Sequence, residues 1–194
     1  MASEVNRTIT QSKSKTRVKK QRPIVLVGLM GAGKSTVGQK LAESLKIPFV
    51  DSDHTIEKEQ KATVSEIFDK KGERYFRKLE RQVISRYLQQ AEPVVLATGG
   101  GAFIEPATRK LIKKKGRSVW LRAEFDTLLE RVSRKKTRPL LEKGDKAAIL
   151  KDLMEKRYPV YAQSDIVVDT TTGPHERVVE QIVTALKTYG TRKN

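Results

Sequence analysis

One segment restricts the possible folds of this chain more than any other. Residues 28–35 read Gly-Leu-Met-Gly-Ala-Gly-Lys-Ser and match the pattern G-x-x-x-x-G-K-[ST] in full. That pattern works between a strand and a helix, because the glycines let backbone N–H groups surround a phosphate and the helix adds its positive end. An apolar run at 24–27 precedes the segment, and a helical pattern at 34–45 follows it. The segment therefore predicts a P-loop that binds a nucleoside triphosphate.

Two side chains of this loop have predicted chemical roles. The Lys34 ammonium is expected to reach the β- and γ-phosphates as a catalytic group, and the Ser35 hydroxyl is expected to ligate Mg²⁺. Magnesium prefers oxygen ligands, so this cofactor is compatible with a chain that has no cysteine and only two histidines. The residues predicted to bind ATP in this segment are Gly31, Ala32, Gly33, Lys34, Ser35 and Thr36.

Apolar runs alternate with helical patterns along the rest of the chain. The runs are continuously apolar, which is typical of parallel strands covered on both faces. Because parallel strands need crossover connections, the alternation predicts a three-layer α/β/α domain around a five-stranded parallel sheet. The predicted strands are 24–27, 48–50, 94–97, 118–121 and 166–168, and the predicted helices are 34–45, 63–68, 73–90, 106–115, 125–134, 146–157 and 174–189.

Charge divides the chain into a tail and a domain. Residues 1–22 hold seven Lys and Arg, one Glu and few apolar residues, which predicts a disordered basic tail. An organelle transit peptide is the alternative interpretation of this segment. Residues 23–190 form the predicted P-loop domain, and residues 191–194 form a C-terminal tail. The net charge of +17 suits either a nucleic-acid-binding protein or an enzyme whose substrates are anions.

Composition excludes several other classes of protein. No run of about 20 apolar residues is present in the sequence, so no membrane span is expected. The lack of cysteine excludes disulfide frameworks and zinc–thiolate sites. A cytoplasmic location is the simplest expectation.

A pair of aspartates follows the second predicted strand. Asp51 and Asp53 are two residues apart, so both carboxylates face the same way on an extended chain. Open α/β sheets bind ligands beyond the carboxyl ends of their strands, and we expect both carboxylates to lie there. The alternative is that Asp53 or Ser52 only caps a helix that begins near His54.

Two more segments suit an anionic acceptor. Arg77 and Glu80 are three apart on a predicted helix and share a face, so Glu80 can hold the guanidinium of Arg77 while that group binds a carboxylate. The alternative, which the spacing alone favours, is an ordinary ion pair on the surface. The glycines at 99–101 follow the predicted strand 94–97, and without Cβ atoms they allow close approach to the backbone. No aspartate ends that strand, so Asp51 is expected to replace the usual acidic residue of P-loop ATPases.

Taken in order, these segments resemble the shikimate kinase family, from Pro23 to about Tyr189. The resemblance implies ATP-dependent phosphorylation of the 3-hydroxyl of shikimate, a step of aromatic amino acid biosynthesis, with Mg²⁺ as cofactor. It implies that Asp53 acts as catalytic base or orients the hydroxyl, and that Asp51 holds Mg²⁺ through water. The substrate-binding residues that it implies are Asp53, Arg77, Gly99, Gly100, Gly101 and Arg157.

The same resemblance implies a mobile lid at about 133–146, a basic segment punctuated by Gly and Pro. Its Arg138 is expected to close over the phosphates as a catalytic and ATP-binding residue. Arg131 and Pro174 match positions at which the family contacts adenine.

Two other functions remain open at this point. Another small-molecule P-loop kinase, acting on gluconate or on a nucleotide, would share the loop, although two arginines on the acceptor side favour a carboxylate over a nucleotide. A non-catalytic regulator related to the family would need a DNA-binding segment, and residues 1–22 are too few for a helix-turn-helix domain. The expected partners are shikimate and ATP, without nucleic acid or membrane, and the expected state is a monomer.

Overall fold

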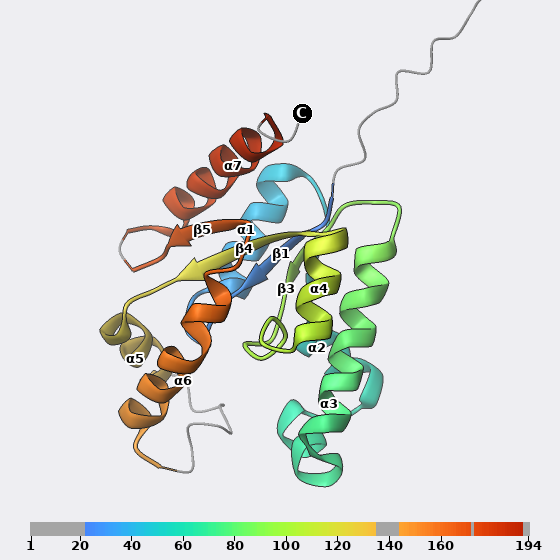
Figure 1. The fold of residues 1–194 in the computed structure, drawn as a ribbon, viewed down its shortest axis with the longest axis vertical. Helices are drawn as coiled ribbons and strands as arrows, with labels where there is room; N and C mark the ends of the chain where they lie inside the picture. The colour runs from blue at the N-terminus through green and yellow to red at the C-terminus, as the bar shows by residue number, and fades with distance from the viewer. Residues whose placement is uncertain (1–21, 135–143, 172, 192–194) are drawn as a thin grey trace, which may run out of the picture.

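Five parallel strands form the central sheet of the structure (Figure 1). This computed structural model describes residues 22–134, 144–171 and 173–191. The prediction of a five-stranded parallel sheet is confirmed, and each predicted strand end lies within one residue of the observed one. The strands are β1 (Ile24–Val27), β2 (Phe49–Asp51), β3 (Val95–Ala97), β4 (Arg117–Arg122) and β5 (Ile166–Asp169), in the order β2-β3-β1-β4-β5.

Three predictions concern residues that lie outside the described part of the chain. The first is the disordered tail, of which only Arg22 is described. The second is the lid, whose central part at 135–143 includes Arg138, and the third is the end of the chain at 192–194. These predictions stay predictions.

Helices cover both faces of the sheet, as predicted. In β1, Leu26 lies beside Gly38 of one helix, while Val25 lies beside Gly116 at the end of another. Successive side chains of a strand point to opposite faces, so these two helices must lie on opposite sides. The helices are α1 (Lys34–Leu45), α2 (Ser52–Gln60), α3 (Val64–Gln89), α4 (Pro106–Lys115), α5 (Phe125–Ser133), α6 (Lys146–Tyr161) and α7 (His175–Thr191). Within the described ranges, no helix is long and apolar enough to cross a membrane.

The core follows the continuous apolar runs of the sequence. Every residue of β1 and β3 is buried, as expected for strands covered on both faces. The edge strand β5 departs from this prediction, because its side chains alternate between buried and exposed and Val167 is 45% exposed. Helix α7 packs on one face of β5, and the other face meets solvent.

Two helices differ from their predicted extents by more than two residues. The predicted helices 63–68 and 73–90 form the single element α3, which is interrupted at Gly72 with φ 78°, a conformation that glycine adopts without strain. Helix α6 continues beyond its predicted end at residue 157, through Pro159, to Tyr161. A proline inside a helix removes one N–H donor and crowds the carbonyl oxygen four residues earlier, and here the helix ends two residues after it.

The topology gathers three segments at one edge of the sheet. In the register of the sheet, Ala97 of β3 lies between Asp51 of β2 and Leu26 of β1. The chain then leaves each of these strands at the same edge, because all of them are parallel. The P-loop, the aspartate pair and the glycines at 99–101 are therefore neighbours in space.

Candidate active site

The P-loop lies between β1 and α1, as the sequence predicts. Gly33 caps α1 with φ 89°, and no described side chain caps that helix end, which leaves its positive pole open to an anion. The Lys34 ammonium bends back over the loop and donates to the carbonyl oxygens of Gly28 at 2.8 Å and Leu29 at 2.9 Å. An incoming phosphate would therefore meet the ammonium at the mouth of the loop.

The remaining loop residues occupy distinct environments. Ala32 is buried, and its carbonyl oxygen accepts a hydrogen bond from Thr170 Oγ1 at 3.3 Å. Ser35 and Thr36 are exposed in the first turn of α1. Thr170 thus ties the end of β5 to the loop and helps to fix its shape.

Ser35 and Asp51 form an oxygen pair beside the loop. The Ser35 hydroxyl donates to Asp51 Oδ2 at 2.8 Å, and oxygen ligands of this kind suit Mg²⁺. Across the described residues, no group of three or more His, Cys, Asp or Glu could hold a metal ion. The pair therefore fits an ion that takes its other ligands from phosphate and water.

Asp51 also caps α2, which corrects the alternative interpretation of this segment. Its Oδ1 accepts hydrogen bonds from the backbone N–H of Asp53 at 3.0 Å and of His54 at 3.4 Å. The helix begins at Ser52, two residues earlier than expected. Because Asp51 serves as the cap, the side chains of Ser52 and Asp53 are not needed for that purpose.

Asp53 and Glu80 meet at Gly99. A Cβ added to Gly99 would lie 2.5 Å from Glu80 Oε1 and 2.8 Å from Asp53 Oδ1. Real Cβ contacts are essentially never that short, so only glycine lets the two carboxylates approach the turn this closely. The Glu80 side chain is 2% exposed, and its Oε1 has no hydrogen-bond partner among the residues described.

These two carboxylates are difficult to ionise. Burial, with a smaller contribution from the charge of Asp51, raises the pKa of Asp53 to about 6, and Lys34 and Arg77 oppose the rise. Burial also raises the pKa of Glu80 to about 7, against the opposing charge of Arg77. Carboxyl groups with such pKa values can exchange a proton near neutral pH.

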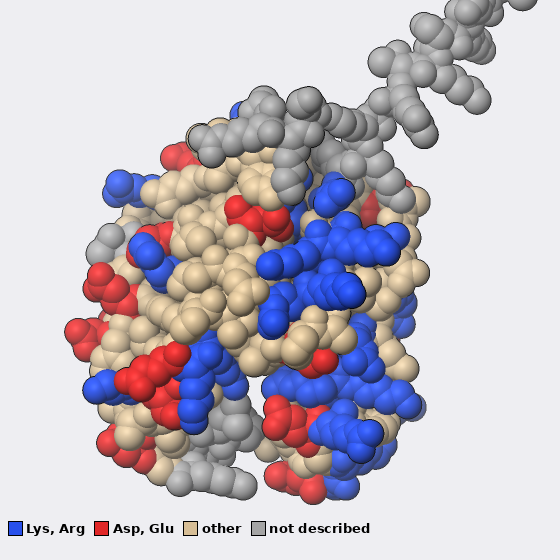
Figure 2. All heavy atoms as spheres, viewed as in Figure 1, with Lys and Arg blue, Asp and Glu red and all other residues tan. Residues whose placement is uncertain are grey.

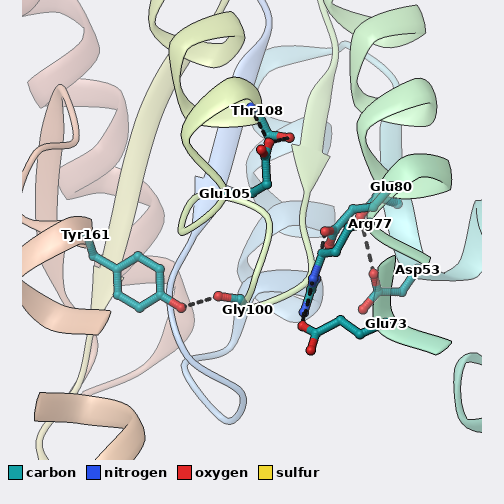
Figure 3. A network of polar contacts seen from close by, with 9 residues as sticks. Asp53, Glu73, Arg77, Glu80, Gly100, Glu105, Thr108 and Tyr161 are labelled. Carbon is teal, nitrogen blue, oxygen red and sulfur yellow. Dashed lines mark hydrogen bonds and ion pairs between the residues drawn. The ribbon is translucent and has the colours of Figure 1, made fainter. Parts of the chain in front are cut away.

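Two glutamates hold Arg77 (Figure 3). Its Nη1 donates to the buried Glu80 Oε2 at 2.7 Å, which confirms the predicted contact. Its Nε and Nη2 donate to Glu73 Oε1 at 3.2 and 3.1 Å. The Glu73 side chain is 65% exposed, so this second partner sits at the solvent side of the guanidinium.

Arg157 reaches the same turn from α6. Its Nη1 would lie 3.2 Å from a Cβ at Gly100, and the Arg77 guanidinium would overlap a Cβ at Gly101. The structure thus brings together all of the residues predicted to bind the acceptor, namely Asp53, Arg77, Gly99, Gly100, Gly101 and Arg157.

The two residues predicted at the adenine both lie near the P-loop. Arg131 donates from Nη1 to the carbonyl oxygen of Gly31 at 3.4 Å and from Nη2 to that of Thr170 at 2.9 Å. Pro174 precedes His175, whose Nε2 would lie 4.0 Å from a Cβ at Gly33. Arg138 lies outside the described residues.

The face of the molecule that carries α3 and α4 is basic. Figure 2 shows Lys and Arg side chains gathered over α3 and α4, and a hollow between the part of the molecule that carries α6 and the part that carries α3. Positive charge beside a hollow attracts anions, which agrees with substrates that carry phosphate or carboxylate groups.

Sequence reasoning missed Glu73 and Tyr161. Glu73 is four residues before Arg77, a spacing at which helical side chains meet, so the signal was present in the sequence. The Tyr161 hydroxyl donates to the Gly100 carbonyl oxygen. No local pattern predicts a contact between residues 61 positions apart.

The raised pKa of Asp53 predicts a pH-dependent gain in stability from Asp53→Asn. The folded pKa of about 6 exceeds the unfolded value of about 3.9, so ionising Asp53 opposes folding. That cost is absent below about pH 4, grows up to about pH 6 and is constant above it. Asparagine cannot ionise, so the variant should be more stable than the parent at pH 7.5, by roughly 2–3 kcal/mol at most, and equally stable at pH 4.

Urea unfolding at both pH values measures this difference, with the exposed Asp69→Asn on α3 as the control. Suppose instead that Asp53→Asn is less stable than the parent at pH 7.5, or that its free energy of unfolding changes equally at both pH values. Either result would show that the fold does not disfavour the ionised form of Asp53.

Comparison with known proteins agrees with this geometry. The family model described as shikimate kinase matches residues 30–187. A shikimate kinase of Mesorhizobium japonicum is 50% identical over 85% of this chain and 81% of its own length. That of Paramagnetospirillum magneticum is 51% identical over 87% and 86%.

Solved structures give the same result. The shikimate kinase of Acinetobacter baumannii in complex with shikimate matches with a TM-score of 0.82 and 38% identity, over 87% of this chain and 94% of that one. A gluconokinase from Sinorhizobium meliloti 1021 shares the fold, with a TM-score of 0.59 and 19% identity over 87% and 93% of the two chains. The extent of these matches and the P-loop beside the glycine turn lead to one assignment: the chain belongs to the shikimate kinase family.

Proposed function

We propose that this chain transfers the γ-phosphoryl group of ATP to the 3-hydroxyl of shikimate, forming shikimate 3-phosphate and ADP. One observation carries the proposal: the Asp53 carboxylate and the guanidinium groups of Arg77 and Arg157 all reach one glycine turn beside the P-loop. A small acid with a ring hydroxyl is complementary to that arrangement. Its carboxylate would pair with the arginines, and its hydroxyl would lie at the aspartate.

The P-loop would hold the phosphates. Backbone N–H groups at the start of α1 and the Lys34 ammonium face the same mouth, and we infer that Lys34 exchanges its loop carbonyls for phosphate oxygens. Ser35 and Asp51 would hold Mg²⁺, with Asp51 acting through water. When bound, the ion neutralises charge on the β- and γ-phosphates.

Asp53 would act on the hydroxyl that attacks. Its carboxylate lies at the turn, 2.8 Å from a Cβ at Gly99, and its pKa is raised to about 6, which brings it closer to the working pH of a general base. Phosphoryl transfer is often loose, so the attacking oxygen needs little deprotonation in the transition state. Asp53 would then contribute mainly by orienting the hydroxyl towards the γ-phosphate.

Arg77 would change partners when the acceptor binds. Glu80 is buried and stays on Nη1, whereas Glu73 is exposed and occupies Nε and Nη2. The substrate carboxylate would replace Glu73 at that edge, and Arg157 would approach it from the other side of the turn. This exchange keeps the charge of Arg77 compensated throughout.

Three further residues would complete the nucleotide site. Arg138 of the lid would close over the phosphates, and Arg131 and Pro174 would contact the adenine. We also propose that the protein acts as a monomer in the cytoplasm, with no nucleic-acid or membrane partner.

A coupled assay for ADP release tests the function. With ATP and Mg²⁺, shikimate should support far faster turnover than gluconate or a nucleoside monophosphate, because two arginines require a carboxylate at a fixed distance from the hydroxyl. EDTA should abolish the activity and added Mg²⁺ should restore it. Gluconate turned over as fast as shikimate would overturn the assignment.

Three substitutions test the exchange at Arg77. Arg77→Ala should raise the shikimate KM by a factor that corresponds to about 2–3 kcal/mol, with the ATP KM within a few-fold of the parent. Glu73→Gln should lower the shikimate KM about two- to fivefold, because it removes a competing but exposed ion pair. Glu80→Gln should raise it, because Arg77 loses its buried support.

Steady-state kinetics with each substrate varied in turn measures these effects. A Glu73→Gln variant whose shikimate KM rises as much as that of Glu80→Gln would show that Glu73 supports Arg77 rather than competing with the substrate.

A further inference from the structure

Tyr161 is the last residue of α6 and one of the largest side chains that are completely buried. A buried hydroxyl is costly unless it forms a hydrogen bond, and this one donates to the carbonyl oxygen of Gly100 (Figure 3). Burial raises the pKa of Tyr161 to about 12, although the positive charge of Arg157 and a hydrogen bond from its guanidinium to the Tyr161 hydroxyl oppose the rise. The hydroxyl therefore remains protonated, and remains a donor, at every physiological pH.

The hydrogen bond from Tyr161 gives the Gly100 carbonyl oxygen a donor from outside the glycine turn. The carbonyl oxygens of Gly99 and Gly101 accept hydrogen bonds from within the turn, from the N–H groups of Ala102 at 3.1 Å and Ile104 at 3.1 Å. The carbonyl of Gly100 is directed to Tyr161 instead. In a planar trans peptide the C=O of one residue and the N–H of the next point in opposite directions, so Tyr161 also sets the direction of the Gly101 N–H.

Tyr161 and Arg157 act on the same point of the turn. They are four residues apart on α6 and so share a face of the helix. A Cβ at Gly100 would lie 3.2 Å from Arg157 Nη1 and 3.7 Å from Tyr161 Oη. Moving the Gly100 peptide would therefore disturb the guanidinium beside it.

We propose that Tyr161 is a positioning residue: its hydroxyl fixes the Gly100–Gly101 peptide and, both directly and through that peptide, the place of Arg157, for the carboxylate end of the acceptor. The proposal rests on the proposed function in that the acceptor is taken to be shikimate. The ring alone does not provide this, because phenylalanine would pack against Trp120 equally well; the ring centroids of Trp120 and Tyr161 are 5.9 Å apart.

Tyr158 provides a matched control. It lies one turn earlier on α6, its ring packs against Trp120 with a centroid separation of 4.9 Å, and its hydroxyl also donates to a backbone carbonyl, that of Ala123. Ala123 follows β4 and lies outside the glycine turn. Tyr158→Phe therefore removes the same kind of bond from the same helix without touching the turn.

The test compares Tyr161→Phe with Tyr158→Phe and the parent protein. Tyr161→Phe should raise the shikimate KM about three- to tenfold, as expected for one lost hydrogen bond, and leave the ATP KM within about twofold. Hydrogen–deuterium exchange at residues 99–103 should become faster in this variant. Tyr158→Phe should change neither the shikimate KM nor that exchange.

Three results would overturn the proposal: an unchanged shikimate KM in Tyr161→Phe, an equal rise in Tyr158→Phe, or a rise in the ATP KM as large as that for shikimate. A parent protein that does not turn over shikimate would instead contradict the proposed function. In that case the rate of hydrogen–deuterium exchange at residues 99–103 still decides whether Tyr161 fixes the turn.

Discussion

The missing side chains at Gly99–Gly101 let charged groups from three helices meet at one edge of the sheet. Asp53 comes from α2, Arg77 from α3 and Arg157 from α6, and each would clash with or crowd a Cβ on the turn. An alanine at Gly99 or Gly101 would push these groups apart by the width of a methyl group. The acceptor side of the site therefore depends on the lack of Cβ atoms along this turn.

Such a meeting of charges is stable only when they compensate one another. Burial favours the uncharged form of two of the carboxylates, whose pKa values are raised to about 6 and about 7 although nearby cations oppose the rise. Lys34, Arg77 and Arg157 supply that compensation. Binding an anionic acceptor and ATP adds negative charge where the cations already lie, which is why the site can hold both substrates close together.

The sequence predicted what depends on local spacing and missed what depends on tertiary contact. The P-loop and the strands were predictable because their patterns are short and continuous. The role of Asp51 as the cap of α2 was not, because Ser52 and Asp53 are equally good capping residues, and the sequence does not show that the chain is extended at Asp51 and helical from Ser52. Tyr161 was missed because the predicted helix ends at residue 157, before Tyr161, and because its partner lies on another element.

The most direct test of this account is a crystal structure of the protein with shikimate and ADP. We expect the carboxylate of shikimate between Arg77 and Arg157, its 3-hydroxyl at about 2.7–3 Å from Asp53, and Glu73 displaced from Arg77 while Glu80 remains. A shikimate molecule whose carboxylate lies away from both arginines, or whose 3-hydroxyl faces away from Asp53, would contradict the account.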